Sequence, residues 1–395
     1  MVKSVDAWLL PDGVADVLPA EAARLESLRR RILDHFSCWG YELVFPPLIE
    51  FLDSLLTGSG RDLDGLTFKI TDQLSGRMMG VRADMTPQVA RLDAHCLPVQ
   101  GPARYCYAGS LLQTRPSGLS ASRCPVQIGA ELYGHAGVDS DIEVISLMLS
   151  VLKIAGAQDI HVDLGHVGIF RSLIAAAELS AEQECALQDV LSRKAMPEWR
   201  EMVPQWVQVP ALQEALLALP LLSGQKAILT ASALSATNLP ASIKQALTDL
   251  EQLLLAVSAR HPDVTVFIDL GELRGYHYHT GIVFAAYVPG QTTELAKGGR
   301  YDHVGEAFGR ARPATGFSAD LKQWLQLSAR TTSQQGVLAP AGTDSALLSA
   351  VAALREQGER VLQQLPGALM HAHDAGCNRE LVLDNGHWVV RQIVS

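Results

Sequence analysis

The sequence lacks the features that mark a membrane protein or a disulfide-stabilised scaffold. No apolar run approaches the ~18 residues that a spanning helix needs, and the six cysteines are scattered without a C-x-x-C pair. Neither a disulfide framework nor a zinc knuckle is therefore predicted. The first residues also lack the cationic start of a secretory signal, so the expected setting is a reducing cytoplasm.

Basic residues are also in deficit. Lys and Arg number 32 against 42 Asp and Glu, which gives a net charge of −10. A protein that binds nucleic acid through its phosphates needs the opposite balance, so tRNA is not expected as a partner. Hydrophobic residues make up 48% of the chain, which is enough to bury extended cores and excludes a disordered chain.

The chain is too long for one compact core at 395 residues, and its composition changes twice. Residues 1–330 alternate predicted strands and helices, interrupted at about 168–262 by a Leu-, Ala- and Gln-rich stretch of short predicted helices. Residues 331–395 form a separate acidic tail, with a predicted helix near Ser345–Gln357 and a hairpin around Asp384-Asn385-Gly386. Helices segregated from mainly antiparallel strands predict an α+β fold.

The segment Val126–Tyr133 is the most informative part of the sequence. Successive side chains of a strand point to opposite faces, so Gln127, Gly129, Glu131 and Tyr133 share one face and apolar residues share the other. An amide, a carboxylate and a phenol would then flank a glycine that leaves room for a ligand. The alternative, an ordinary solvent-exposed sheet face, is equally compatible with this strand alone.

A second predicted strand places Arg82, Asp84 and Thr86 on one face. Asp84 and Glu131 together would suit a ligand cation, because a desolvated ammonium group is usually paired with carboxylates. The alternative is a salt bridge within the protein, between Asp84 and Arg82 or a neighbour. Residue pattern alone does not separate the two interpretations.

A third segment, Arg274–Gly281, carries an arginine, two tyrosines and two histidines between glycines. Histidines at positions i and i+2 are potential metal ligands, but the segment has no Asp, Glu or Cys to complete a set, so no metal site is predicted. A polar site for a small molecule fits better. The segment Lys297–Asp302 contains adjacent glycines without the spacing of a phosphate-binding loop, and no cofactor is predicted.

Together these segments resemble the catalytic domain of histidyl-tRNA synthetases along most of residues 10–327. Tyr41–Glu50, with its Pro-Pro pair, is similar to motif 1 of the class II synthetases, and Arg104–Tyr133 to motif 2 and its return strand. Arg274–Gly281 resembles the histidine-specific R-G-L-D-Y-Y segment. The resemblance implies a class II synthetase-like antiparallel sheet flanked by helices, with a helical insertion and a small C-terminal α/β domain, reduced relative to an anticodon-binding domain.

The residues that bind the amino acid are retained in this resemblance. The implied histidine-binding residues are Asp84, Thr86, Gln127, Glu131, Arg274, Tyr278 and His279. The first three would hold the α-ammonium group, Arg274 would face the carboxylate, and the others would recognise the imidazole. His279 stands where the synthetases have tyrosine, and an imidazole there can still donate or accept a hydrogen bond.

The residues that bind ATP in the synthetases are replaced. The motif 2 arginine, which contacts the α-phosphate, is matched by Gln113, with Arg115 nearby as an alternative. The motif 3 arginine, which holds the γ-phosphate, is matched by Gln323 in a predicted helix over about Ser318–Leu327. Arginine offers phosphate a permanent charge and a planar fork, and glutamine offers neither. Each lost contact costs on the order of 10²- to 10³-fold in rate, so we expect aminoacylation to be lost.

A histidine site without an ATP site is typical of the regulatory subunits of short-form ATP phosphoribosyltransferase, which the chain also resembles in its Tyr-His-Tyr-His segment and shortened tail. That resemblance implies a non-catalytic subunit of the enzyme that begins histidine biosynthesis. Its expected partners are the short catalytic subunit, which it activates, L-histidine as feedback effector, and a second copy of itself in a homodimer within a hetero-oligomer. Two alternatives remain: an active histidyl-tRNA synthetase, and a synthetase-like binding module in another pathway.

Overall fold

The computed structural model describes residues 8–57, 60–97, 99–116, 122–224, 234, 238–327, 336–368, 370–372 and 374–393. Contacts within the chain divide it into two compact units, residues 1–328 and 329–395, and each unit has a hydrophobic core of its own. Within the described ranges, no helix is long and apolar enough to cross a membrane.

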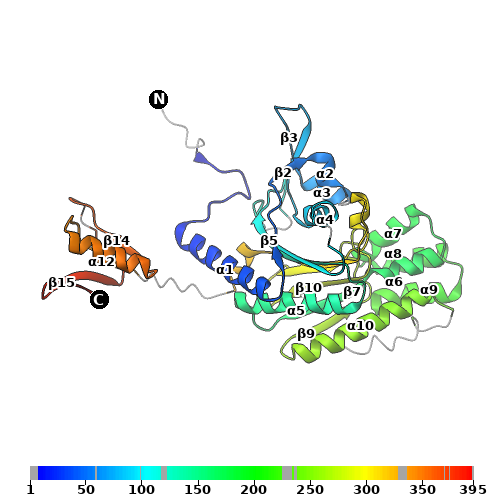
Figure 1. Ribbon diagram of the computed structural model, residues 1–395. Helices are drawn as coiled ribbons and strands as arrows, with labels where there is room; N and C mark the ends of the chain where they lie inside the picture. Colours follow the sequence, from blue (N-terminus) through cyan, green and yellow to red (C-terminus); the bar gives the residue numbers. More distant parts are fainter. Residues whose placement is uncertain are drawn as a thin grey trace. The chain divides into compact units, whose positions relative to one another are not determined.

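A nine-stranded sheet forms the centre of the larger unit (Figure 1). Its neighbouring strands run antiparallel, except that β1 pairs with β5 and β7 pairs with β9 in parallel. In spatial order the strands are β1 (Glu42–Leu43), β5 (Ala103–Ser110), β6 (Val126–Tyr133), β12 (Ala314–Asp320), β11 (Ala296–Arg300), β10 (Ile282–Tyr287), β7 (His161–His166), β9 (Thr265–Asp269) and β8 (Ser223–Gly224). The predicted α+β arrangement is confirmed.

Three long helices cover one face of this sheet: α1 (Pro19–Cys38), α5 (Val138–Ala155) and α10 (Ala241–Arg260). α5 packs against both of the others. It is apolar on nearly every side, so most of its residues are buried in the main core, as expected for a helix with neighbours all round. Ile128 and Ala130 of β6 belong to the same core, which leaves the opposite face of β6 for polar side chains.

The opposite face of the sheet carries a smaller core. The helix α4 (Thr86–His95) packs against the short 3₁₀ helix η5 (Val304–Phe308), and tyrosines of β5 and β6 lie in the same cluster. A small antiparallel sheet and two short helices adjoin this core: β2 (Ile49–Phe51), β4 (Met78–Val81), β3 (Phe68–Thr71), α2 (Leu52–Leu56) and α3 (Gly60–Leu66). β3 and β4 are consecutive in the chain and pair antiparallel as a hairpin.

Helices fill the stretch between β7 and β9. The first are short, as expected: α6 (Val167–Ala176), α7 (Ala181–Ser192), α8 (Met196–Trp206), α9 (Pro210–Ala218) and η2 (Leu219–Leu221). The expectation of short helices is wrong for α10, which spans 20 residues. Apolar residues recur along it at helical spacing, and no proline interrupts it after Pro240.

One predicted helix is shorter than expected and is preceded by the end of a strand. The chain from Ser318 to Asp320 continues β12 between β6 and β11, so the helix predicted over about Ser318–Leu327 is reduced to α11 (Leu321–Trp324). The central position of β12 explains the error, because the sheet supplies hydrogen-bond partners on both sides of the chain.

The predicted strand through Arg82, Asp84 and Thr86 is also wrong. β4 ends at Val81 and α4 begins at Thr86. Pro87 explains the difference, because proline suits the first turn of a helix and cannot donate to a strand partner. Thr86 therefore lies at a helix N-terminus, and Asp84 lies in the connection before it.

The smaller unit is a four-stranded sheet in the order β14 (Val361–Gln363), β13 (Val337–Ala339), β15 (Arg379–Asp384), β16 (His387–Gln392). Its helix α12 (Ser345–Glu356) matches the predicted one and contributes Leu347 and Val351 to the core. The predicted hairpin is confirmed. Asn385 and Gly386 both have positive φ, as a two-residue turn between twisted strands requires.

Candidate ligand-binding site

Glu131 lies on the polar face of β6 and is almost fully buried, with 1% of its surface exposed. Its carboxyl group accepts a hydrogen bond from the Tyr107 hydroxyl at 3.0 Å and a short one from the Tyr301 hydroxyl. The Tyr107 hydroxyl also lies 3.1 Å from that of Thr86. The strand alternation thus predicted the right face for Glu131, and the alternative of a solvent-exposed face is wrong.

Two cross-strand glycines make room for this hydrogen-bond network. Gly316 is paired with Glu131, and a Cβ atom at Gly316 would collide with the carboxyl group. Gly129 is paired with Tyr107, and a Cβ atom there would collide with the phenol oxygen. Because the paired residues are glycines without side chains, the side chains of Glu131 and Tyr107 can extend over the neighbouring strand. The space that Gly129 was predicted to leave for a ligand is therefore occupied by a tyrosine.

The electrostatics of Glu131 are set by burial. Burial raises the pKa of Glu131 to about 8, although hydrogen bonds from Tyr301 and Tyr107 oppose the shift. Burial and the adjacent carboxyl group hold the pKa of both tyrosines well above the usual range. At neutral pH Glu131 carries a proton much of the time and can donate or accept a hydrogen bond. Such a group suits a ligand whose own ring nitrogens titrate near neutral pH.

Asp84, Thr86 and Gln127 form the second part of the site. The Gln127 amide donates to Asp84 Oδ1 at 2.8 Å, and its oxygen accepts from the backbone N–H of Met85 at 2.9 Å. Asp84 Oδ1 also accepts from the backbone N–H of Thr86 at 3.0 Å, a local contact that favours a turn over a strand. These bonds fix a carboxylate beside the Thr86 hydroxyl, close to the Glu131 network.

Arg82, the alternative partner of Asp84, is engaged elsewhere. It donates to the carbonyl oxygens of Pro46 at 2.7 Å and Ser110 at 3.0 Å. The predicted alternative of an Asp84–Arg82 salt bridge is therefore wrong. A carboxylate that is not neutralised by this arginine can still bind a ligand ammonium group.

The segment Arg274–Gly281 places two aromatic side chains beside the Glu131 network. The ring centroids of Tyr278 and His279 lie 5.0 Å and 6.5 Å from that of Tyr301. Among the described residues, the Tyr278 hydroxyl and His279 Nδ1 are buried without a hydrogen-bond partner. Burial lowers the pKa of His279 to about 4, so its imidazole is neutral. Buried polar atoms are nearly always paired, so these two are open to a ligand.

Arg274 lies apart from these residues. Its guanidinium donates to the Tyr287 hydroxyl at 2.8 Å and lies 3.6 Å from the Glu272 carboxylate. Tyr287 belongs to β10, which β11 and β12 separate from β6 in the sheet. The structure therefore brings the other predicted binding residues together around Glu131 and leaves Arg274 over a different strand.

The glutamines at the predicted phosphate positions bind the protein itself. Gln113 donates to the carbonyl oxygen of Ala83 at 3.2 Å, and Gln323 donates to the Thr293 hydroxyl at 2.8 Å. Neither amide carries a charge, so neither offers the attraction that a phosphate group needs. Arg115, the alternative phosphate ligand, is exposed.

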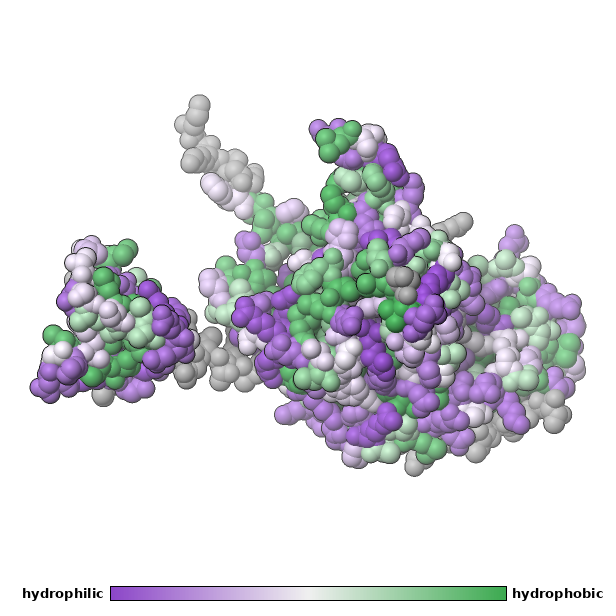
Figure 2. Space-filling model, in the orientation of Figure 1, coloured by the Kyte–Doolittle hydropathy of each residue, from purple (hydrophilic) through white to green (hydrophobic). Residues whose placement is uncertain are grey.

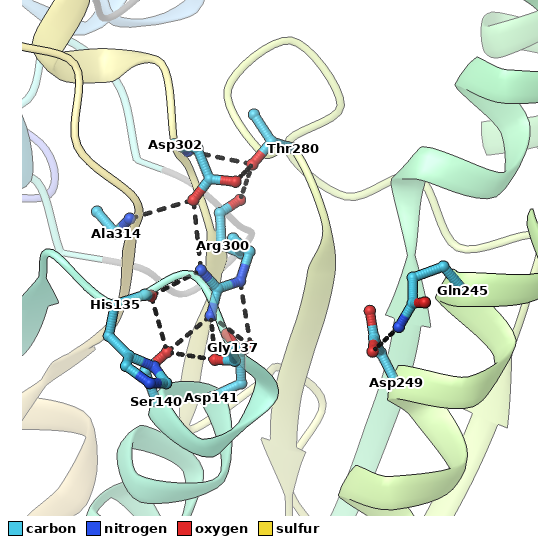
Figure 3. Close-up of polar contacts among 10 residues, drawn as sticks. All are labelled: His135, Gly137, Ser140, Asp141, Gln245, Asp249, Thr280, Arg300, Asp302 and Ala314. Atoms are coloured by element: carbon cyan, nitrogen blue, oxygen red, sulfur yellow. Dashed lines mark hydrogen bonds and ion pairs between the residues drawn. The ribbon is translucent and has the colours of Figure 1, made fainter. Parts of the chain in front are cut away.

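A buried arginine next to the site ties three parts of the chain together (Figure 3). Arg300 donates to Asp141 Oδ2 at 2.6 Å and to Ser140 Oγ at 2.7 Å, at the start of α5. Its guanidinium also lies 3.4 Å from Asp302, whose carboxylate accepts from the Thr280 hydroxyl at 3.1 Å. Thr280 directly follows His279, so this network holds one end of the segment Arg274–Gly281.

Two residues of the site were missed or undervalued by sequence reasoning. Tyr107 was not identified, and Tyr301 was noted only as part of a glycine-rich segment. The available signal for Tyr107 was the cross-strand pairing of β5 with β6, which sets it opposite Gly129. Across the described parts of the chain, no three His, Cys, Asp or Glu side chains are grouped to hold a metal ion. The carboxyl groups, hydroxyls and imidazole gathered here suit a small organic molecule with an ammonium group and a ring that exchanges a proton.

The fold and the site define a protein of the class II aminoacyl-tRNA synthetase-like type. The histidyl-tRNA synthetase family model matches residues 13–324, and the model for the ATP phosphoribosyltransferase subunit HisZ C-terminal domain matches residues 334–391. The chain belongs to the family of ATP phosphoribosyltransferase regulatory subunits. Relatives with this name from Thioalkalivibrio sulfidiphilus and Stutzerimonas stutzeri are 53% and 52% identical, covering 98% and 100% of this chain and the same shares of their own.

Solved structures have the same architecture. An ATP phosphoribosyltransferase regulatory subunit/histidyl-tRNA synthetase from Bacillus halodurans matches with a TM-score of 0.81 and 25% identity, over 93% of this chain and 95% of that one. A histidyl-tRNA synthetase from Nostoc matches with a TM-score of 0.77 and 16% identity, over 98% and 97%, and shows the fold alone. The predicted synthetase-like fold and the predicted family are confirmed. Family membership makes the chain a regulatory component of histidine biosynthesis.

Proposed function

We propose that this chain is a cytoplasmic histidine sensor without catalysis of its own. It binds L-histidine at the Glu131 site, activates the short catalytic subunit of ATP phosphoribosyltransferase, and makes that subunit sensitive to histidine. The observation that carries the proposal is the contrast between the buried Glu131 network, with its unpaired Tyr278 and His279 atoms, and the neutral glutamines at both predicted phosphate positions. Aminoacylation is lost, and tRNA is not a partner.

Each part of histidine has a partner in this proposal. Asp84, held by Gln127, and the Thr86 hydroxyl bind the α-ammonium group, because a carboxylate and a hydroxyl oxygen both accept hydrogen bonds from it. The imidazole lies among Glu131, Tyr278 and His279, and it satisfies polar atoms that otherwise lack partners. Arg274 faces the carboxylate, which requires it to exchange Tyr287 and Glu272 for the ligand.

Regulation follows from a shift between two states of the assembly. Histidine must bind one state better than the other, because a ligand with equal affinity for both shifts neither. Closure of a loop over the bound histidine supplies the difference and carries the signal to the partner interface. The coupling is reciprocal, so substrates that favour the active state of the catalytic subunit weaken histidine binding.

A homodimer is the core of the proposed assembly. Several large apolar side chains around the edge strand β1 are exposed by 41–73%: Leu43, Phe45, Leu48 and Ile49. Figure 2 shows hydrophobic surface gathered between α1 and the three-stranded sheet. An apolar patch beside a sheet edge is a usual site of protein association.

The test is a pair of calorimetric titrations of the purified chain, one with L-histidine and one with ATP·Mg²⁺. The proposal expects saturable heat with histidine and none with ATP. Adding the short catalytic subunit should then give higher activity that histidine inhibits. Saturable ATP binding, or charging of tRNA with histidine, would instead support an active synthetase.

A further inference from the structure

The segment that carries Tyr278 and His279 is anchored at its C-terminal end. Its C-terminal end is held by Thr280, whose hydroxyl bonds to Asp302 beside Arg300 (Figure 3). The backbone N–H of Val167, at the start of α6, donates to the carbonyl of Gly281 at 3.0 Å. The β11 strand and the first residue of α6 thus fix where the segment ends.

The middle of the segment is held from the helical insertion by one arginine. Arg171 of α6 donates from Nη2 to the carbonyl oxygens of Tyr276 at 2.8 Å and His279 at 3.2 Å. Its guanidinium also lies over the Tyr276 ring, 4.7 Å from the ring centroid. The Tyr276 hydroxyl donates to Glu184 of α7 at 2.6 Å, so a second insertion helix supports the same ring.

The two carbonyl groups that Arg171 binds lie on either side of Tyr278. Between them the backbone makes a tight turn, in which the N–H groups of Tyr278 and His279 both approach the Gly275 carbonyl at 2.8 Å. A turn in this register directs the two side chains toward Tyr301. A planar guanidinium suits the task, because it can bind two acceptors while stacking on an aromatic ring.

We infer that Arg171 is a positioning residue for ligand recognition, which holds the turn that presents Tyr278 and His279 to the imidazole. The inference rests on the proposed histidine site and deepens it. It gives the helical insertion a role in ligand affinity, although no insertion residue need contact the ligand. A change in the position of α6 therefore alters histidine affinity.

The first test compares Arg171→Ala with a matched control, Arg193→Ala. Arg193 lies just after α7 and binds two acceptors, Asp189 and Glu198, both within the insertion. Arg171→Ala removes two hydrogen bonds from a charged donor, so L-histidine should bind roughly 10- to 100-fold more weakly by calorimetry. Arg171→Lys, which keeps the charge but not the planar guanidinium group, should weaken histidine binding less. Arg193→Ala should bind like wild type.

A double-mutant cycle distinguishes positioning from general loss of structure. If Arg171 acts through Tyr278, its removal should matter much less in a Tyr278→Phe background, where the hydroxyl that it positions is absent. Purely additive losses, or unchanged histidine affinity in Arg171→Ala, would overturn the inference. If Arg171→Ala proves unfolded by circular dichroism, the cycle is measured with Arg171→Lys. A wild-type chain that does not bind histidine would instead refute the proposed function.

Discussion

The two ends of β6 differ in what the side chains around them do. Around Glu131, its buried carboxyl group, three hydroxyls and two unpaired polar atoms converge from five parts of the chain. Four residues back along β6, beyond Gln127, the chain presents Gln113 and Gln323, which bind neighbouring groups of the protein. At one end two buried polar atoms lack partners among the described residues, and at the other the two glutamines carry no charge to offer a phosphate.

The difference is informative because the two groups of side chains have different effects on the stability of the fold. A buried carboxyl group whose pKa is raised to about 8 is unfavourable for stability unless something compensates, and strongly shifted groups cluster at functional sites. Neutral amides with local partners carry no such cost. Retention of the first arrangement beside the second fits a chain that binds an amino acid without activating it.

The largest effect that would sharpen this contrast is expected from Glu131→Ala. The change removes the acceptor of Tyr107 and Tyr301 as well as the ligand's partner, so L-histidine should bind at least about 100-fold more weakly. Assembly with the catalytic subunit should persist, because Glu131 is buried away from any surface. Calorimetry and gel filtration measure the two properties, and unchanged feedback inhibition in this variant would refute the site.

A smaller effect is expected at the Asp84 end. Asp84→Asn removes the charge that faces the ligand ammonium, and L-histidine should bind roughly 10- to 100-fold more weakly. Imidazole propionate lacks the ammonium group, so its weaker binding should not change. An equal loss for both ligands would mean that Asp84 supports the fold of the site through Gln127 and Thr86 and does not contact the ammonium group.

The pH dependence of histidine affinity should show that Glu131 and the ligand imidazole share one proton. Between about 6.5, the usual imidazole value, and about 8, the value for Glu131, a protonated Glu131 meets a neutral imidazole and no proton is exchanged with solvent. Below this window binding must release a proton, and above it binding must take one up, so affinity falls about tenfold per pH unit on either side. Titrations with L-histidine and with imidazole propionate, which has no ammonium group to titrate, check the profile across pH 5–9.5. Glu131→Gln should lose only the alkaline limb, and a flat profile in wild type would contradict the assignment.

The structure could be predicted from the sequence where a local repeat of side chains or a turn motif determines it. Alternation along Val126–Tyr133 gave the faces of Gln127 and Glu131 correctly, and the Asn-Gly turn gave the C-terminal hairpin. It failed at Asp84 and Thr86 and at Ser318–Asp320, where a strand meets a helix within a few residues. At such junctions each element contributes too few residues for its side-chain period to be measured. Hydrogen bonds to distant parts of the chain then determine where the strand ends and the helix begins.

Partners from distant parts of the chain could not be predicted in this way. Tyr107 depends on which strand lies beside β6, and Arg171 depends on how a helix of the insertion meets a turn more than a hundred residues later. The exclusion of Arg82 as a partner of Asp84 likewise depends on two backbone carbonyls from separate segments. The resemblance to synthetases supplied the ligand roles, and the structure supplies these supporting contacts.

The smallest effect is expected at the other end of the comparison, from Gln323→Ala. Its amide donates to one partly exposed hydroxyl on Thr293, and substitutions at such positions usually change stability by less than about 0.5 kcal/mol. L-histidine should therefore bind within about twofold of wild type. Gln323→Arg should bind histidine equally well, since the added charge lies on α11, which follows Asp320, the partner of Gln127 at the far end of β6 from Glu131. A tenfold loss in either variant would show that the former nucleotide end helps to build the histidine site, and the two ends could no longer be treated as separate.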